Sequence, residues 1–126
     1  MRIISTSDSP TPAGHYSQGI VHNGVLYVSG MLAVDPVTGE KKLGSIEEQT
    51  RQVLENLDGV LRSAETTRDK VIKCTVYVSD ISLWGQVNAV YAEFFGDHKP
   101  ARAIVPTRNL HFGFLVEIDC IAVVDE

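Results

Sequence analysis

The pattern of apolar and polar residues changes along the chain, and the first third carries β-strand signals. Residues 19–21 and 25–29 are mainly apolar runs on either side of His-Asn-Gly at 22–24. Asn-Gly between two such runs is a strong hairpin signal, because both residues adopt the positive φ of a tight turn at little cost. A second turn cluster, Asp-Pro-Val-Thr-Gly at 35–39, follows a short apolar piece at 31–34. We therefore predict that the front third is β and begins with a hairpin.

Two amphipathic helices are predicted behind this hairpin. From Ser45 onward one face collects the apolar residues Ile46, Val53, Leu54, Leu57, Val60, Leu61 and Ala64, and the other positions hold Glu47, Gln52, Glu55 and Arg62. Ser45 and Glu48 have the spacing of a capping box, in which each side chain satisfies a free backbone N–H at the helix start. The second helix covers about 83–95 with Gly96 as its C-terminal stop, and Pro100 then forbids continuation. Its apolar stripe is Leu83, Val87, Val90, Tyr91 and Phe94.

Period-2 alternation predicts two longer strands, at 71–79 and 115–124. In the first, one face holds Ile72, Cys74, Val76 and Val78, and the other holds Lys73, Thr75 and Tyr77. In the second, the face that the helices should cover is Val116, Ile118, Cys120, Ala122 and Val124. The opposite face, Leu115, Glu117, Asp119, Ile121 and Val123, is too polar for a core and too apolar for water. We expect further copies of the chain to cover it in a closed symmetric assembly.

Composition narrows the class of protein. A chain of 126 residues with 44% hydrophobic and 21% charged residues is the size and balance of one globular domain, 1–126. Its net charge of -5 and pI near 5.3 argue against nucleic acid as the main ligand. The N-terminus lacks the apolar run of a signal peptide and no stretch is long enough to cross a bilayer, so a cytoplasmic location without membrane contact is expected. Cys74 and Cys120 are expected to be buried thiols, without a disulfide or a metal.

One strand carries the residue of greatest chemical interest. Residues 100–105 read as a short strand in which Arg102 faces away from Ala101, Ala103 and Val105. If this strand pairs antiparallel with the last strand, Arg102 and Glu117 share the face without helices. An arginine at a subunit boundary offers a rigid donor fork for a carboxylate, and Glu117 can hold or deprotonate a water. The alternative, from residue types alone, is a structural ion pair.

Five segments together resemble a known family. They are Gly-His-Tyr-Ser-Gln-Gly at 14–19, Val-Ser-Gly at 28–30, residues 87–95, Pro-Ala-Arg-Ala at 100–103, and residues 116–123. In this order and spacing they resemble the RidA/YjgF/UK114 family of reactive intermediate deaminases, also called the endoribonuclease L-PSP family. The resemblance implies an α+β, chorismate-mutase-like fold, with a mixed, mainly antiparallel sheet and two helices on one face. It also implies a homotrimer with the sheets facing inward and with clefts between subunits.

The resemblance further implies an activity and a site. Family members hydrolyse 2-aminoacrylate, 2-aminocrotonate and their imine tautomers to 2-keto acids and ammonia, without a metal or an organic cofactor. Arg102 falls on the carboxylate-binding arginine and Glu117 on the acid that positions the attacking water, with the main-chain carbonyl near Ile104 as a second water ligand. Tyr16, Ser29 and Asn88 fall on positions that line the cleft. By residue type alone, these three are equally an interface aromatic, a turn hydroxyl and a helix-surface amide.

Several positions depart from the family's common pattern and leave the substrate open. Met31 stands where glutamine is frequent, Ile104 replaces a frequent threonine or cysteine, and residues 110–113 replace a Leu-Pro turn. His111 could bring an imidazole to the cleft mouth, or be an ordinary loop histidine. Alternatives to the general deaminase are a specialised deaminase, for example of 2-aminomuconate, and a non-catalytic metabolite-binding or regulatory trimer. A ribonuclease is disfavoured by the acidic balance and by the absence of a recognisable His-His-Lys constellation.

Overall fold

The predicted hairpin is present and forms part of the sheet. In the computed structural model, which describes residues 1–125, β2 (Gly19–His22) and β3 (Val25–Met31) are joined by Asn23 and Gly24, with φ of 51° and 73°. Two consecutive positive φ values match the right-handed twist of the paired strands. β1 (Arg2–Ile4), which the sequence pattern did not predict, pairs antiparallel with β2. Position 126 of the expected domain 1–126 lies outside the described residues.

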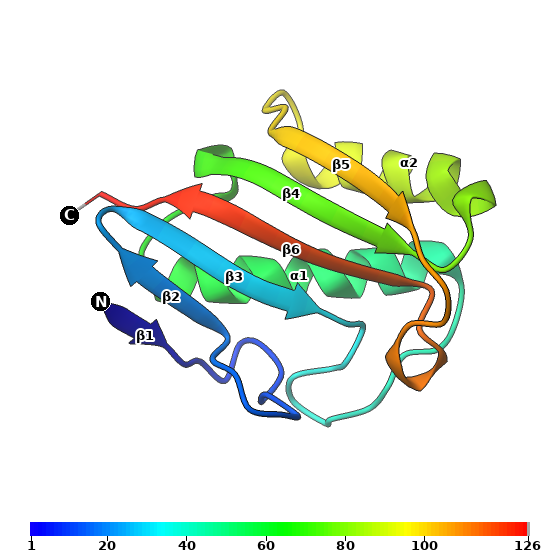
Figure 1. Ribbon diagram of the computed structural model, residues 1–126, viewed down its shortest axis with the longest axis horizontal. Helices are drawn as coiled ribbons and strands as arrows, with labels where there is room; N and C mark the ends of the chain where they lie inside the picture. Colours follow the sequence, from blue (N-terminus) through cyan, green and yellow to red (C-terminus); the bar gives the residue numbers. More distant parts are fainter. Residues whose placement is uncertain (126) are drawn as a thin grey trace.

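The strand order is β1-β2-β3-β6-β4-β5, so β6 (Val116–Val123) lies in the middle of the sheet between β3 and β4 (Val71–Val78) (Figure 1). All pairs are antiparallel except β4 with β5 (Ala101–Pro106), which is parallel. The predicted antiparallel pairing of the Arg102 strand with the last strand is therefore wrong. A helical crossover joins β4 to β5 and returns the chain to the starting edge, and a strand placed in this way runs parallel to the one before it.

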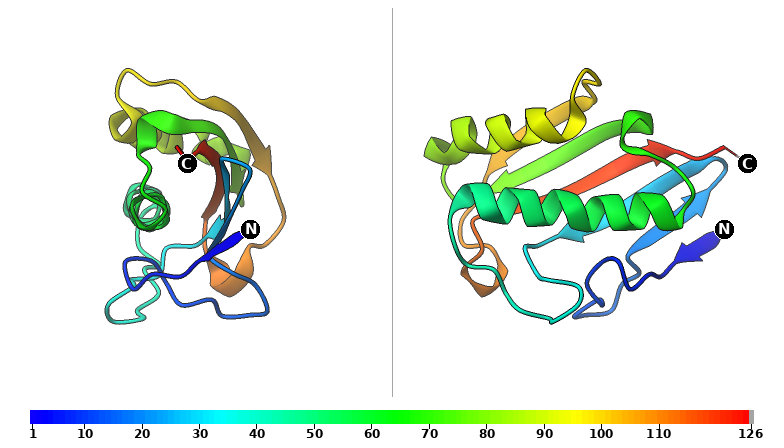
Figure 2. Two further views of the ribbon diagram at one scale, coloured as in Figure 1. Left: turned by 90° about the vertical axis from the view of Figure 1, so that its left-hand side faces the viewer. Right: turned by 180° about the vertical axis from the view of Figure 1, so that it is seen from behind.

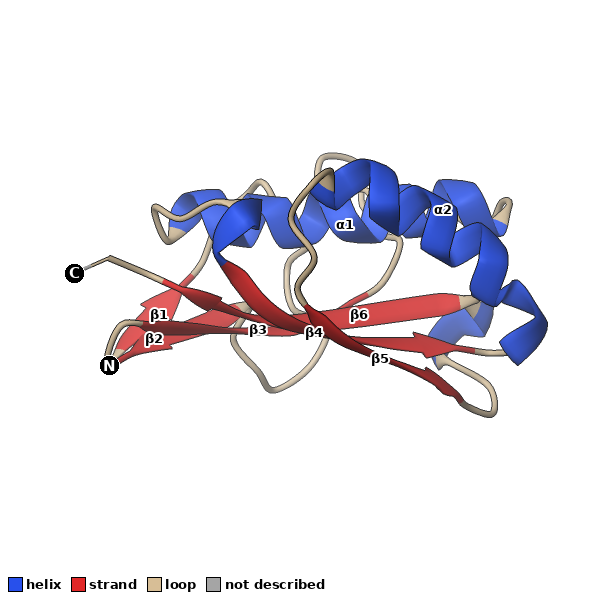
Figure 3. Ribbon diagram, turned by 90° about the horizontal axis from the view of Figure 1, so that it is seen from above, coloured by secondary structure: helices blue, strands red, loops and turns tan. Residues whose placement is uncertain are grey.

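Both predicted helices lie on one face of the sheet (Figures 2 and 3). α1 (Ile46–Ser63) starts at Ser45, whose hydroxyl accepts a hydrogen bond from the Glu48 N–H at 3.2 Å. This bond is one half of the predicted capping box. α2 (Trp84–Phe95) stops at Gly96, which has a φ of 62°. Short 3-10 turns occur at η1 (Arg68–Lys70), η2 (Ile81–Leu83) and η3 (His111–Gly113).

The core between sheet and helices agrees with most of the predicted faces, and it differs from them in three regions: the start of β4, the middle of α1 and the end of α2. Val71 is buried and Ile72 is 45% exposed, because the β4–β6 register shifts between Val71 and Lys73. Gln52 is buried, and its amide donates to Asn56 Oδ1 at 2.9 Å. Phe95, at 7% exposure, belongs to the core, whereas Phe94 is only half-buried.

The predicted burial of the two thiols is confirmed. Cys74 and Cys120 are free and buried, and they lie opposite each other in the β4–β6 register. Their side chains point toward the helices, into the core. This position suits a small apolar residue and explains why the sheet tolerates two thiols at its centre.

The sheet face without helices, called the helix-free face below, carries exposed apolar side chains beside two carboxylates. The exposed apolar residues include Ile3, Tyr27, Val105 and Val123. Glu117 and Asp119 of β6 are half-buried among them. This mixture is what the alternation in the last strand predicted. Neither helix of the described residues is long and apolar enough to cross a membrane.

Candidate functional site

Glu117 lies on the helix-free face against a glycine. Its Oε2 would be only 2.3 Å from a Cβ atom placed on Gly30 of β3. Burial raises the pKa of the Glu117 carboxyl, the nearby Asp119 charge raises it further, and His111 opposes this shift. A carboxyl that is costly to ionise, next to a position without a side chain, is suited to exchanging protons with a bound molecule.

Asp119 extends the acidic character of this face. Its Oδ2 accepts a hydrogen bond from the Tyr77 hydroxyl at 3.4 Å. Burial raises the pKa of Asp119, and the Asp119 charge raises the pKa of Tyr77. Glu117 and Asp119 therefore both resist ionisation, and the Asp119 charge adds to the cost of ionising Glu117.

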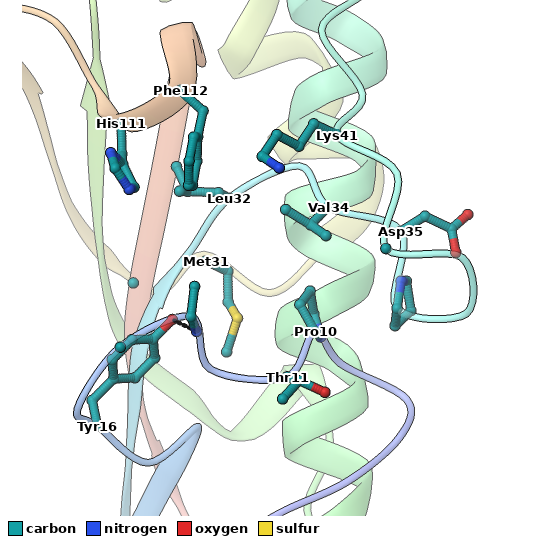
Figure 4. A pocket seen from close by; sticks show the side chains of 15 residues that line it. Pro10, Thr11, Tyr16, Met31, Leu32, Val34, Asp35, Lys41, His111 and Phe112 are labelled. Atoms are coloured by element: carbon teal, nitrogen blue, oxygen red, sulfur yellow. Dashed lines mark hydrogen bonds between the residues drawn. The ribbon is translucent and has the colours of Figure 1, made fainter.

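The loop before β2, which contains Tyr16, is tied to β3 at Ser29, the residue before Gly30. The Ser29 hydroxyl donates to the Ser17 carbonyl, and the Ser29 N–H donates to the Gln18 carbonyl at 2.9 Å. Tyr16 is half exposed, and its hydroxyl accepts a hydrogen bond from the Ala13 N–H at 3.4 Å (Figure 4). We refer to Tyr16, Ser29, Gly30 and Glu117 as the acid half-site.

Gln18 supports this loop and was missed by the sequence reasoning. Its side chain is buried and donates to the carbonyls of Thr6, Ser9 and Pro10. It also accepts a hydrogen bond from the Thr6 N–H at 2.7 Å. A glutamine inside the Gly-His-Tyr-Ser-Gln-Gly segment was the available signal, because a buried amide can tie several backbone strands together.

A cavity of about 440 Å³ opens beside the acid half-site (Figure 4). We call it the Met31 chamber, and its lining includes Tyr16, Gly30, Met31, Leu32, Val34 and Phe112. His111 and Lys41 also border it. Two of the departures from the family pattern, at Met31 and at the 110–113 turn, therefore meet in one cavity. The third, Ile104, lies elsewhere, on β5.

Arg102 is held on the other side of the sheet by α2. Its Nη1 donates to Asn88 Oδ1 at 2.9 Å, and its guanidinium carbon lies 4.8 Å from the ring centroid of Tyr91 and 5.5 Å from that of Trp84. Trp84, Asn88 and Tyr91 follow the i, i+4, i+7 spacing of one helix face. The sequence thus brings an arginine, an amide and two rings together, and we refer to these four residues as the arginine half-site.

The arginine half-site borders a hollow in the protein surface. Asn88, Tyr91 and Arg102 line a hollow of about 420 Å³ together with the segment from Phe95 to Pro100. Ile104, two residues after Arg102 on β5, is also half-buried and packs against the core. The guanidinium is thus neither locked in the core nor free in solvent, but positioned at the rim of a cavity.

The expectation that Arg102 and Glu117 share one face of the sheet is wrong. Arg102 pairs with Cys74 across β5 and β4, and Cys74 points toward the helices. Glu117 pairs with Tyr77 across β6 and β4, on the helix-free face. The physical reason is the register of the parallel β4–β5 pair, which places Arg102 beside Cys74 on the face that the helices cover. β4 also separates the strand of Arg102 from the strand of Glu117. Within one copy, Arg102 and Glu117 therefore do not face each other.

Comparison with known proteins covers both half-sites. A model of the family described as "Endoribonuclease L-PSP" matches residues 6–124. The chain belongs to this family, also known as the RidA/YjgF/UK114 family. The relationship predicted from the five sequence segments is thus confirmed, and with it the α+β fold with a mixed, mainly antiparallel sheet and two helices.

Several RidA/YjgF family members are similar over nearly their whole length. The RutC family protein PH0854 of Pyrococcus horikoshii is 44% identical over 120 residues, which is 95% of each chain. The 2-iminobutanoate/2-iminopropanoate deaminase of Rattus norvegicus is 38% identical over 122 residues, covering 97% of this chain and 89% of the rat protein. Among solved structures, E. coli TdcF with bound serine superposes with a TM-score of 0.94 at 32% identity, covering 99% of this chain and 100% of TdcF.

Proposed function

We propose that this chain is a cytoplasmic enamine and imine deaminase that hydrolyses 2-aminoacrylate- and 2-aminocrotonate-type intermediates to 2-keto acids and ammonia. The observation that carries the proposal is Glu117, a half-buried carboxyl with a raised pKa that faces a glycine beside a cavity. The similarity to a rat 2-iminobutanoate/2-iminopropanoate deaminase supports it.

In the proposed reaction, Glu117 acts as the base and then as the acid. Its carboxylate takes one proton from water as the water oxygen bonds to the carbon of the protonated imine, which gives a neutral carbinolamine. The carboxylic acid returns this proton to the amino nitrogen, and the C–N bond breaks as the carbinolamine hydroxyl gives its own proton to the carboxylate. Ammonia and the 2-keto acid leave, and Glu117 releases the last proton to solvent. An imine is already electrophilic, so the reaction needs placement of one water and of the substrate rather than a cofactor. A pKa raised toward neutrality suits a group that must accept and release one proton.

Arg102 is proposed to bind the substrate carboxylate through its two-pronged guanidinium. Asn88 fixes the plane of the fork, and the rings of Tyr91 and Trp84 shield the ion pair from water. Tyr16, Ser29 and the Ile104 carbonyl are proposed to line the remaining walls. All of these roles are proposals that follow from position and chemistry.

Because Arg102 and Glu117 lie on opposite faces, a complete site is proposed to need two copies of the chain. The arginine half-site of one copy would meet the acid half-site of the next. Such a contact joins two different surfaces, and it closes into a ring when the rotation between copies permits. We propose a homotrimer with three such clefts, which would also cover the apolar residues of the helix-free face.

The decisive experiment is direct measurement of imine hydrolysis, with imines generated in situ from amino acids by an amino-acid oxidase. Glu117→Gln keeps the size of the side chain but removes the base, so the catalysed rate should fall about 100-fold or more. Glu93→Gln, a change on an exposed carboxylate of α2, is the matched control and should leave the rate unchanged.

Imine hydrolysis, ligand binding by calorimetry and RNA degradation together separate the rival functions. An unchanged rate in Glu117→Gln would refute the assigned role of the acid. A wild-type protein that binds imine or keto acid in calorimetry without accelerating hydrolysis would be a metabolite-binding module. Degradation of RNA by highly purified, metal-free protein would instead support a ribonuclease.

A further inference from the structure

We propose that the Met31 chamber is the side-chain subsite of this deaminase, and that its preferred substrates are 2-imino acids with a large apolar side chain. This inference rests on the proposed function and names the substrate class for the same site. Imines of leucine, methionine and phenylalanine belong to this class. The imine of alanine, with only a methyl group, does not.

The location of the chamber is the first argument. Tyr16 and Gly30 belong both to its lining and to the acid half-site. Glu117 Oε2 lies directly against Gly30, so the reacting carbon of a substrate held by this acid is next to the chamber mouth. The substituent on that carbon then has the chamber as the adjacent empty space.

The size and lining of the chamber are the second argument. Its volume of about 440 Å³ lies within the range of roughly 300–1,000 Å³ that is typical of small-molecule sites. Met31, Leu32 and Val34 present apolar side chains to it (Figure 4). A methyl substituent would leave most of this space without contacts, whereas a butyl or benzyl group would bury its surface there. Met31 adds an adaptable thioether that can pack against aliphatic and aromatic groups alike.

The backbone at Phe112 is the third argument. Phe112 has a φ of 57° and a ψ of 14°, in the left-handed region that bulky residues rarely adopt. This conformation keeps the ring 45% exposed at the chamber wall, stacked on His111 with 3.6 Å between ring centroids. A strained backbone that holds a large apolar ring out of the core is typical of a binding surface.

The charged residues of the chamber lining already have neighbours. Lys41 has its Nζ 4.6 Å from the centroid of the Phe112 ring. Asp35, which also lines the chamber, forms an ion pair with Lys42, whose Nζ lies 3.7 Å from Asp35 Oδ2. An imine with a second carboxylate, of the 2-aminomuconate type, therefore meets the Asp35 carboxylate as well as the Lys41 ammonium in this lining. Lys41 over an aromatic ring is compatible with a neutral apolar group beneath it.

The test is a panel of imines made in situ from alanine, leucine, methionine, phenylalanine and glutamate, each rate being divided by its uncatalysed rate. For the wild type, kcat/KM for the phenylalanine and leucine imines should exceed that for the alanine imine by roughly tenfold or more. Met31→Gln and Phe112→Ala should remove most of this preference, with a larger loss of kcat/KM for the phenylalanine and leucine imines than for the alanine imine.

Controls keep the proposal falsifiable. Leu43→Gln changes an apolar residue that is 54% exposed and outside the chamber lining, and it should not alter the preference. Met31 is buried, so thermal unfolding must show that Met31→Gln folds. If it does not fold, the exposed Phe112 variant carries the test.

The outcomes separate this inference from the proposed function. If no imine is hydrolysed faster than in buffer, the proposed function fails. If imines are hydrolysed but alanine or glutamate imine is preferred, or if neither chamber variant changes the ratio, the chamber is not the side-chain subsite and the deaminase proposal stands.

Discussion

The acid half-site and the arginine half-site differ in how they treat the charge of their central residue. Glu117 lies where its charged form is disfavoured, since burial and the Asp119 charge both raise its pKa. Arg102 lies where its charge is accommodated, with an amide oxygen at 2.9 Å and two aromatic rings around the guanidinium. The first environment raises the pKa of a carboxyl, and the second holds a guanidinium in a fixed orientation. This contrast matches the proposed roles, in which Glu117 transfers protons and Arg102 positions the substrate.

The two half-sites also differ in what holds them. The acid half-site combines a central strand with a loop that Ser29 and Gln18 tie down. The arginine half-site combines an edge strand with one face of α2. Edge strands are exposed along one side and are natural places for contact with another chain. The position of β5 at the sheet edge therefore supports the proposed contact between the arginine half-site of one copy and the acid half-site of the next.

The sharpest way to test this contrast is to remove the guanidinium. Arg102→Ala should lower kcat/KM for imine hydrolysis on the order of 100- to 1,000-fold, because the substrate carboxylate loses its paired charge. Arg68→Ala is the matched control, since Arg68 also contacts a ring of α2, at 3.9 Å from the Phe94 centroid, yet lies outside the half-site. Steady-state kinetics should find Arg68→Ala close to wild type. Equal losses in both variants would mean that the arginine acts through helix stability.

Mixing two inactive variants tests whether the half-sites come from different copies. In trimers reassembled at random from Arg102→Ala and Glu117→Gln chains, roughly a quarter of the clefts regain both groups, so about a quarter of wild-type activity should return. Activity is measured after exchange through a mild denaturant. Mixing Arg102→Ala with the double variant cannot rebuild a cleft and should give no recovery. A mixture no more active than its parents would place both groups of each site in one copy.

Local signals in the sequence predicted most of the helices and strands, but they did not predict which strand pairs with the strand of Arg102. Asn23-Gly24, the Ser45 cap and Gly96 act within a few residues, so their outcome is already decided locally. The alternation around Arg102 is the same whichever strand lies beside it. Only the crossover through α2 decides that this neighbour is β4, and with it the face on which Arg102 lies.

The sequence did not predict the Met31 chamber either, although it drew attention to some of the residues that line it. Met31 and the 110–113 turn stood out only as departures from a family pattern. Their convergence depends on the loop after β3 and on the positive φ of Phe112, a conformation that residue type disfavours. A resemblance can therefore mark the positions that differ, and the fold has to bring them together.

A single methyl group on Gly30 should separate reactivity from stability. In Gly30→Ala the new Cβ would lie 2.3 Å from Glu117 Oε2, and the flexible carboxylate end must move away. Displacement of a catalytic group by about 1 Å is expected to lower kcat roughly tenfold to 100-fold, with little change in the melting temperature. Gly85→Ala, in α2, meets no atom within 4 Å and should keep full activity. Full activity in Gly30→Ala would show that the position of this carboxylate is not critical.

The smallest expected effect concerns the pH dependence set by the neighbouring carboxylate. Asp119 raises the pKa of Glu117, so Asp119→Asn should lower it. If deprotonated Glu117 is the base, activity is lost as the pH falls through its pKa, and the acidic limb of the kcat/KM profile should move to lower pH in the variant.

The raised pKa of Asp119 itself means that folding disfavours its charge, so the stability of the protein falls as the pH rises from the unfolded-state pKa of Asp119 through its folded-state pKa. Asp119→Asn should therefore melt a few degrees higher than wild type at pH 7.5, with the gap closing in acid, whereas the exposed Asp97→Asn should change neither the limb nor the melting temperature. An acidic limb that stays in place would show that Glu117 does not titrate in this step, and the assignment of the base would have to move to another group.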